Sequence, residues 1–123
     1  MTSRQTNRQR IIAFFEALNA GDVDAVMACY APGAMIDVVA PGPFAGRQPA
    51  SAEGLRAFFR MIPELRFEIL GMLVEGDRVA VELSSSGRLA NGQPYQNRYH
   101  DLFELADGRI ALFREYPTFP VPT

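Results

Sequence analysis

Acid–base chemistry in this chain can come from only a few residue types. The 123 residues include fourteen Asp and Glu, one His and one Cys, and all twelve basic residues are Arg. Without Lys there is no Schiff-base or lysine-base chemistry, and a single Cys with a single His excludes disulfide frameworks and Cys/His zinc sites. Glycine-rich phosphate-binding motifs are also absent. We therefore expect chemistry without a metal or cofactor, carried by carboxylates, Tyr, Arg, Ser or His100.

His100 and Asp101 are neighbouring acid–base candidates. His100 is the one side chain that titrates near neutral pH without help from its surroundings. Side chains alternate between the two faces of a strand, so only one of these neighbours is expected to face the interior unless the strand is bulged. A Ser-His-Asp triad is not favoured, because the run Ser84–Ser86 has no nucleophile-elbow context.

The charge pattern argues against two classes of partner. The net charge is −2, the sequence pI is about 5.3 and the arginines are scattered, so nucleic acid is not expected to bind. No apolar stretch approaches the roughly 20 residues of a membrane span, and the segment Met1–Arg10 is polar, unlike a secretion signal. We expect a cytoplasmic protein that binds neither nucleic acid nor membranes, with Cys29 as a small core residue.

Helical signals fill the first half of the chain. Apolar residues recur at helical spacing, Asp22 and Ser51 are suitable N-caps, and Pro32-Gly33 and Pro63 are suitable stops. The predicted elements are helices at Ser3–Ala20, Val23–Tyr30 and Ser51–Ile62, a short strand at Met35–Ala40, and a rigid loop at Pro41–Gly46.

The second half alternates between apolar and polar residues, as strands do. Turn signals at Glu75–Asp77, Asn91-Gly92 and Asp107-Gly108 divide it. Three helices followed by an antiparallel meander predict one α+β domain over residues 1–123, in which the helices cover one face of a curved sheet and enclose an apolar ligand site. The predicted strands are Leu65–Leu70, Val79–Ser84, Tyr95–Leu105 and Ile110–Tyr116.

Four segments in this order closely resemble the SnoaL-like polyketide cyclases. They are Phe14–Ala25, Tyr30–Ala34, Glu75–Val81 and Asp101–Ile110. That family belongs to the nuclear transport factor 2-like superfamily, together with ketosteroid isomerases. The resemblance implies a cone-shaped barrel of three N-terminal helices packed on a curved, mainly antiparallel sheet, a pocket between the two layers, and a homodimer through the outer face of the sheet.

The resemblance also implies a role for Asp101. This residue matches the aspartic acid that ketosteroid isomerases keep protonated as a hydrogen-bond donor. Phe14 stands where those isomerases have a Tyr, and Val38 stands where they have the base, with Asp37 one position earlier. A shift of one residue turns a strand side chain to the other face, so Asp37 can serve only if a bulge re-aims it.

Glu115 is the alternative base. The segment Ile110–Tyr116 resembles the final strand of the cyclases, although the Asp that commonly follows it there is absent here. If this strand turns Phe113 and Glu115 inward, Glu115 lies on a strand next to that of Asp101. Two carboxyl groups in one apolar cavity raise at least one pKa and provide an acid and a base near neutral pH.

The predicted walls of the pocket are mainly aromatic. Glu82 has two interpretations: it shares a polar strand face with Ser84 and Ser86, which is either the outer face or part of the pocket. The remaining candidates for substrate contact are Phe14, Tyr30, Phe58, Phe59, Tyr99, Phe103 and Phe113.

Three functions fit this pattern. The first is cofactor-free acid–base catalysis, of the isomerase, cyclase or dehydratase type, on a small hydrophobic carbonyl compound. The second is a non-catalytic binding or assembly domain in which Asp101 is part of a structural salt bridge. The third is chemistry like that of epoxide hydrolases, which requires an Arg such as Arg98 between two inward carboxylates.

Overall fold

Capping side chains set the bounds of the three helices. The computed structural model describes residues 2–119. Thr2 accepts a hydrogen bond from the backbone N–H of Gln5 at the start of helix α1, and Gly21, with φ of 66°, ends it. Asp22 and Ser51 cap the next two helices in the same way. The helices are α1 at Ser3–Ala20, α2 at Val23–Ala28 and α3 at Ala52–Met61.

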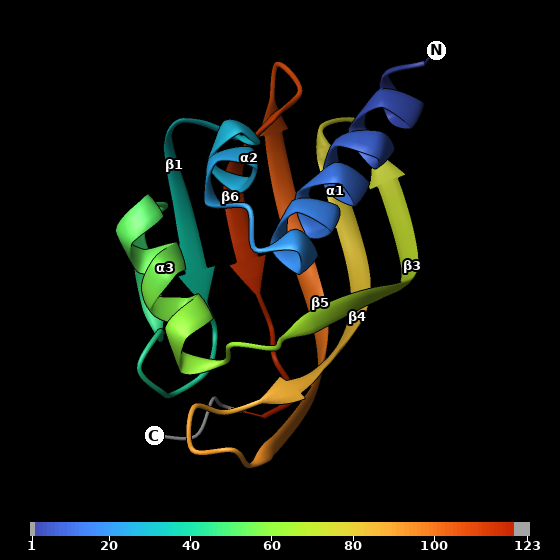
Figure 1. The fold of residues 1–123 in the computed structure, drawn as a ribbon. Helices are drawn as coiled ribbons and strands as arrows, with labels where there is room; N and C mark the ends of the chain where they lie inside the picture. Colours follow the sequence, from blue (N-terminus) through green and yellow to red (C-terminus); the bar gives the residue numbers. More distant parts are fainter. Residues whose placement is uncertain (1, 120–123) are drawn as a thin grey trace.

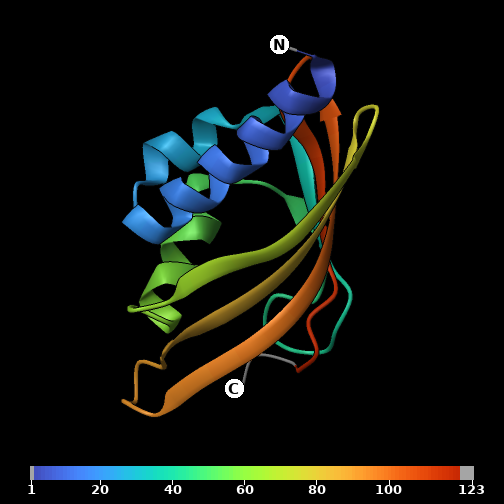
Figure 2. The ribbon, with the colours of Figure 1, turned by 90° about the vertical axis from the view of Figure 1, so that its right-hand side faces the viewer.

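The sheet is a six-stranded layer with the order β2-β1-β6-β5-β4-β3. Strands β3 to β6 form an antiparallel meander, and β1 joins β6 in parallel. Figure 1 and Figure 2 show the three helices on one side of this curved sheet, which confirms the predicted α+β arrangement. The strands are β1 at Tyr30–Val38, β2 at Gly46–Pro49, β3 at Arg66–Glu75, β4 at Arg78–Arg88, β5 at Pro94–Ala106 and β6 at Arg109–Glu115.

Two predicted boundaries in the first half are wrong. Helix α2 ends at Ala28, and Pro32-Gly33 lies inside β1 instead of stopping a helix. The β1–β6 register is irregular between Tyr30 and Met35, and Gly33 has φ of 74°, so the strand accommodates both residues at a break in the pairing. The predicted loop at Pro41–Gly46 is one residue too long, because strand β2 begins at Gly46 and its four exposed residues pair with β1.

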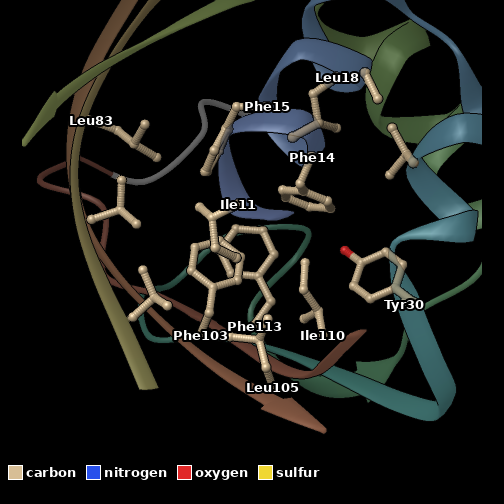
Figure 3. Close-up of a cluster of buried hydrophobic side chains, with 14 of the residues drawn as sticks. Ile11, Phe14, Phe15, Leu18, Tyr30, Leu83, Phe103, Leu105, Ile110 and Phe113 are labelled. Atoms are coloured by element: carbon tan, nitrogen blue, oxygen red, sulfur yellow. The ribbon is translucent and has the colours of Figure 1, made fainter. Parts of the chain in front are cut away.

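The hydrophobic core joins helix α1 to strands β5 and β6 (Figure 3). The rings of Phe103 and Phe113 are stacked, with their centroids 4.5 Å apart. Phe14 meets both rings and that of Tyr30 edge-on, at 5.5–5.7 Å between centroids. This aromatic cluster fixes α1 above the middle of the sheet. Within residues 2–119, no helix combines the length and apolar character needed to cross a membrane.

Two amide side chains of α1 bind the far strands. Asn19 donates to the carbonyl of Phe67, with 2.9 Å between the two atoms, and accepts from the N–H of the same residue at 2.7 Å. Near the other end of the helix, Asn7 donates to the carbonyl of Gly76 at 2.9 Å. Because these bonds satisfy polar groups on both layers, they hold the helix and the sheet at a fixed separation on the β3 side.

Candidate active site

A cavity of about 350 Å³ lies between the inner face of the sheet and the helices. Its walls are predominantly apolar, and residues 40–45 contribute one side. A size of a few hundred cubic ångströms and an apolar lining with a few polar groups are typical of a site for a small organic molecule. The lining comprises Phe14, Leu18, Met27, Tyr30, Ile36, Val38, residues 40–45, Gln48, Pro49, Ser51, Gly54, Leu55, Ala57, Phe58, Phe67, Tyr95, Tyr99, Phe113, Glu115 and Pro117.

Two carboxyl groups meet at the wall of this cavity. Strands β5 and β6 pair Leu102 with Arg114, and beyond the end of β6 Tyr99 pairs with Pro117, so the same register sets Asp101 opposite Glu115. The backbone N–H of His100 donates to the carbonyl of Tyr116 at 3.1 Å, so His100 and Tyr116 are a hydrogen-bonded pair of the two strands. Hydrogen-bonded and non-hydrogen-bonded pairs alternate along antiparallel strands, so the next pair, Asp101 with Glu115, is a non-hydrogen-bonded one. The Cβ atoms of such a pair approach to about 4.5–5.5 Å.

The surroundings of the pair disfavour negative charge. Burial raises the pKa of Glu115 from 4.5 to about 7. Burial also raises the pKa of Asp101 well above its ordinary value, and the nearby charge of Glu115 raises it further, whereas the Tyr116 backbone N–H lowers it by less. Asp101 is 0% exposed, and neither carboxyl oxygen has a hydrogen-bond partner of good geometry within residues 2–119. Both carboxyl groups therefore favour their protonated forms, and Glu115 titrates near neutral pH.

Phenolic hydroxyl groups lie near Glu115. Burial raises the pKa values of both Tyr30 and Tyr99, and the charge of Glu115 contributes to each shift, so both phenols remain neutral donors. The Tyr99 hydroxyl shares a hydrogen bond of 2.6 Å with Ser85 Oγ. The Tyr30 hydroxyl has no partner among the described residues. It is therefore available to a ligand.

Several predicted site residues meet at the cavity. Glu115, Phe14, Tyr30, Phe58, Tyr99 and Phe113 all line it. Asp101 lies beside Glu115 but does not line the cavity, so its predicted direct contact with substrate is not seen. Phe103 is fully buried in the core, and Phe59 packs against the core from α3. These two rings support the wall without forming it.

The structure corrects the prediction for Asp37. Its carboxylate accepts from Arg114 Nε at 3.0 Å and lies 3.7 Å from Arg47. The register irregularity of β1 ends before Asp37, so nothing turns this residue back, and its neighbour Val38 lines the cavity instead.

Glu82 and His100, both kept as candidate site residues, do not reach the cavity, so the outer-face interpretation of Glu82 is the correct one. They are exposed and face one another across β4 and β5, on the outer side of the sheet. Strand alternation puts Asp101 inside and His100 outside, because no bulge interrupts this pairing. Arg98 has the same parity as His100 and is exposed, so the carboxylate–Arg–carboxylate arrangement of the third functional hypothesis is not formed.

Two polar residues of the inner face, Ser85 and Asn97, were not selected from the sequence, although both are buried. Alternation from Val81 and Asp101 places both on the inner face, which was the available signal. Among the described residues, no three His, Cys, Asp or Glu side chains come together as a metal site would require.

The family follows from comparison with known proteins. The family model described as "SnoaL-like domain" matches residues 11–113, which is most of the chain. The chain belongs to the SnoaL-like domain family. No protein of curated function matches it significantly.

Solved structures show the same fold at low identity. A Bacillus subtilis protein provisionally described as an isomerase is 21% identical, with a TM-score of 0.85 over 96% of this chain and 90% of that one. A protein of Jannaschia sp. CCS1 provisionally described as a SnoaL-like polyketide cyclase is also 21% identical, with a TM-score of 0.77 over 96% and 90%. An NTF2-like protein of Burkholderia xenovorans LB400 is 20% identical, with a TM-score of 0.76 over 95% and 92%. The SnoaL-like chain therefore has the nuclear transport factor 2-like fold, which hosts many reactions.

Proposed function

We propose that this SnoaL-like protein catalyses cofactor-free proton transfer on a small hydrophobic carbonyl compound, with Glu115 as the general base. The observation that carries the proposal is the position of Glu115 on an apolar cavity wall, beside the buried carboxyl group of Asp101, with the pKa of Glu115 raised to about 7. A base whose pKa lies near the working pH is present in its active form and is still basic enough to accept a proton.

The proposed step begins with the substrate carbonyl in the cavity. Glu115 removes a proton from the carbon next to the carbonyl group, and the electron pair of that C–H bond forms an enolate. The Tyr30 hydroxyl, which has no partner among residues 2–119, donates a hydrogen bond to the developing oxyanion. Protonated Glu115 returns its proton to carbon in an isomerisation, or to an alkoxide after the enolate has attacked a second carbonyl in a cyclisation.

Asp101 acts through Glu115 because it does not line the cavity. In its protonated form it lets the pair carry a single negative charge, and this charge is located on the carboxyl group that reaches the substrate. We assign it as a positioning residue.

Hydrogen–deuterium exchange tests the proposal without knowledge of the natural substrate. Small ketones such as 1-tetralone and 2-tetralone are incubated with the protein in D₂O, and loss of the α-proton signal is followed by NMR. We expect catalysed exchange that rises with pH up to about 7 and then levels off. Glu115→Gln should slow it about 10²- to 10⁴-fold. Glu82→Gln, a matched change on the outer face, should leave it unchanged. Equal rates in the protein and its Glu115→Gln variant contradict the proposal.

A non-catalytic ligand-binding domain is the second candidate. It is favoured by Phe14 and Val38, which make the cavity wall apolar where the resembling isomerases have a Tyr and the base. This candidate predicts that the same ketones bind with no catalysed exchange at any pH. Binding together with Glu115-dependent exchange rejects it.

A further inference from the structure

A second group of polar side chains lies on the inner face, further along β5 from the acid pair. Ser85, Tyr95, Asn97 and Tyr99 are 3–7% exposed, and the two tyrosines line the cavity. The proposed proton transfer uses none of these four side chains. Buried polar groups are retained in native proteins when their hydrogen bonds are satisfied, so the donors and acceptors of this cluster can be counted one by one.

Asn97 is fully satisfied, and its bonds fix its orientation. Its Oδ1 accepts from the backbone N–H groups of Phe119 and Arg98, at 3.1 and 2.9 Å. Its Nδ2 donates to the Phe119 carbonyl at 2.8 Å and to the Tyr95 hydroxyl oxygen at 2.7 Å. Exchanging the amide oxygen and nitrogen would place two donors against two N–H groups, so this assignment is the only consistent one.

The proton of the Tyr95 hydroxyl is left over. Because Asn97 donates to the Tyr95 oxygen, this hydroxyl is an acceptor in that bond and must direct its own proton elsewhere. The Ser85 and Tyr99 hydroxyls share one hydrogen bond of 2.6 Å. The Tyr99 hydroxyl also interacts with that of Tyr95, but no acceptor of good geometry for the Tyr95 proton is found among the described residues. Tyr95 thus presents a donor at the cavity wall.

We propose that the Tyr95 hydroxyl, oriented by Asn97, donates a hydrogen bond to a second oxygen of the substrate, remote from the carbonyl that reacts at Glu115. Tyr99 and Asn97 lie two and four residues from Asp101 along β5, so the polar end lies about 7–13 Å from the acid pair. The substrate class is an elongated molecule of about two fused rings, with a ketone at one end and a carbonyl, hydroxyl or ether oxygen at the other. This inference rests on the proposed function, because it takes the same cavity as the substrate site.

Matched naphthols test the proposal by binding alone. A naphthol carries its oxygen on an sp² carbon, as an enol does, and 6-methoxy- and 6-ethyl-2-naphthol differ mainly in one acceptor oxygen. Their affinities are measured by calorimetry for the protein, for Tyr95→Phe and for the control Tyr116→Phe, whose hydroxyl is on an exposed side chain. We expect the methoxy-to-ethyl affinity ratio to fall about fivefold in Tyr95→Phe, as for one neutral hydrogen bond, and to stay constant in Tyr116→Phe.

The remaining outcomes separate this proposal from the proposed function. An unchanged ratio in Tyr95→Phe overturns the subsite and leaves Glu115 as the base. If thermal denaturation shows that Tyr95→Phe is unfolded, the unsubstituted protein decides: tighter binding of the ethyl compound overturns the subsite, and tighter binding of the methoxy compound supports it. If neither naphthol binds, the cavity is not the ligand site and both proposals are rejected. Loss of the Glu115 effect on exchange, with the naphthol ratio intact, rejects only the catalytic role.

Discussion

Replacing Glu115 by Gln should make the protein more stable at alkaline pH. The folded chain holds the Glu115 proton more tightly than the unfolded chain does, because burial raises its pKa from 4.5 to about 7. The folded state therefore binds more protons between these two values, and stability falls as the pH rises through this window. Gln has nearly the same shape and does not titrate, so the variant should lack this loss.

The size of the effect follows from the two pKa values. Each pKa unit corresponds to 1.36 kcal/mol, so a change from 4.5 to about 7 gives about 3 kcal/mol. Below pH 4.5 both proteins carry an uncharged side chain at this position and should be similarly stable. Above pH 7 the Gln variant should be the more stable by about 3 kcal/mol, which shifts the urea midpoint by about 1–3 M.

Urea denaturation at half-unit steps from pH 4 to pH 9 measures this difference. Glu82→Gln is the matched control, because Glu82 is exposed on the outer face and the same chemical change there should shift the midpoint by a constant amount. A midpoint difference for Glu115→Gln that does not depend on pH would refute the reasoning, since it would mean that the Glu115 carboxyl has the same pKa in both states.

Three further outcomes are expected. Asp101→Leu should raise the free energy of unfolding at neutral pH by about 1–3 kcal/mol, because the buried carboxyl group has no hydrogen-bond partner of good geometry in residues 2–119, and should slow ketone exchange; a lower urea midpoint would contradict this. Tyr30→Phe should lower kcat for exchange about tenfold or more without changing Tm, since the hydroxyl makes no hydrogen bond to any of the described residues; an unchanged kcat would remove the oxyanion role. We also propose a homodimer through the outer face, where Leu73 of β3 is 75% exposed, so Leu73→Glu should give monomers in sedimentation velocity, and a wild-type monomer would reject this interface.

Local signals predicted most of the fold. The helix starts at Asp22 and Ser51 were readable because a cap is a bond between residues three positions apart. The meander was readable because each of its strands alternates and each turn carries Gly. Strand β2 was not, because its four residues are exposed and its existence depends on pairing with β1, which no local pattern records.

For the candidate site, the sequence predicted which face of a strand each side chain shares with its neighbours, and little more. Alternation correctly separated Asp101 from His100 and put Glu115 on the same face as Phe113, which the structure turns inward. Whether two carboxyl groups actually meet depends on the register between β5 and β6, which the length of the Asp107-Gly108 turn and the bulge near it decide. The fate of Asp37 depended on a parallel pairing that brings Arg114 beside it from 77 positions away. The polar subsite depended on Asn97 reaching Phe119, 22 positions away.

The raised pKa of Glu115 also depends on the absence of positive charge near it on the inner face. The chain has twelve arginines, and none of them is among the described residues that line the cavity. Arg114 precedes Glu115 directly, yet strand alternation turns it outward, where Asp37 holds it at 3.0 Å. A cation on the inner face would stabilise the carboxylate and lower the pKa of Glu115 towards that of an ordinary acid. The outer ion pair therefore serves the inner face as well, because it holds the Arg114 charge away from Glu115, the one carboxyl group among the described lining residues.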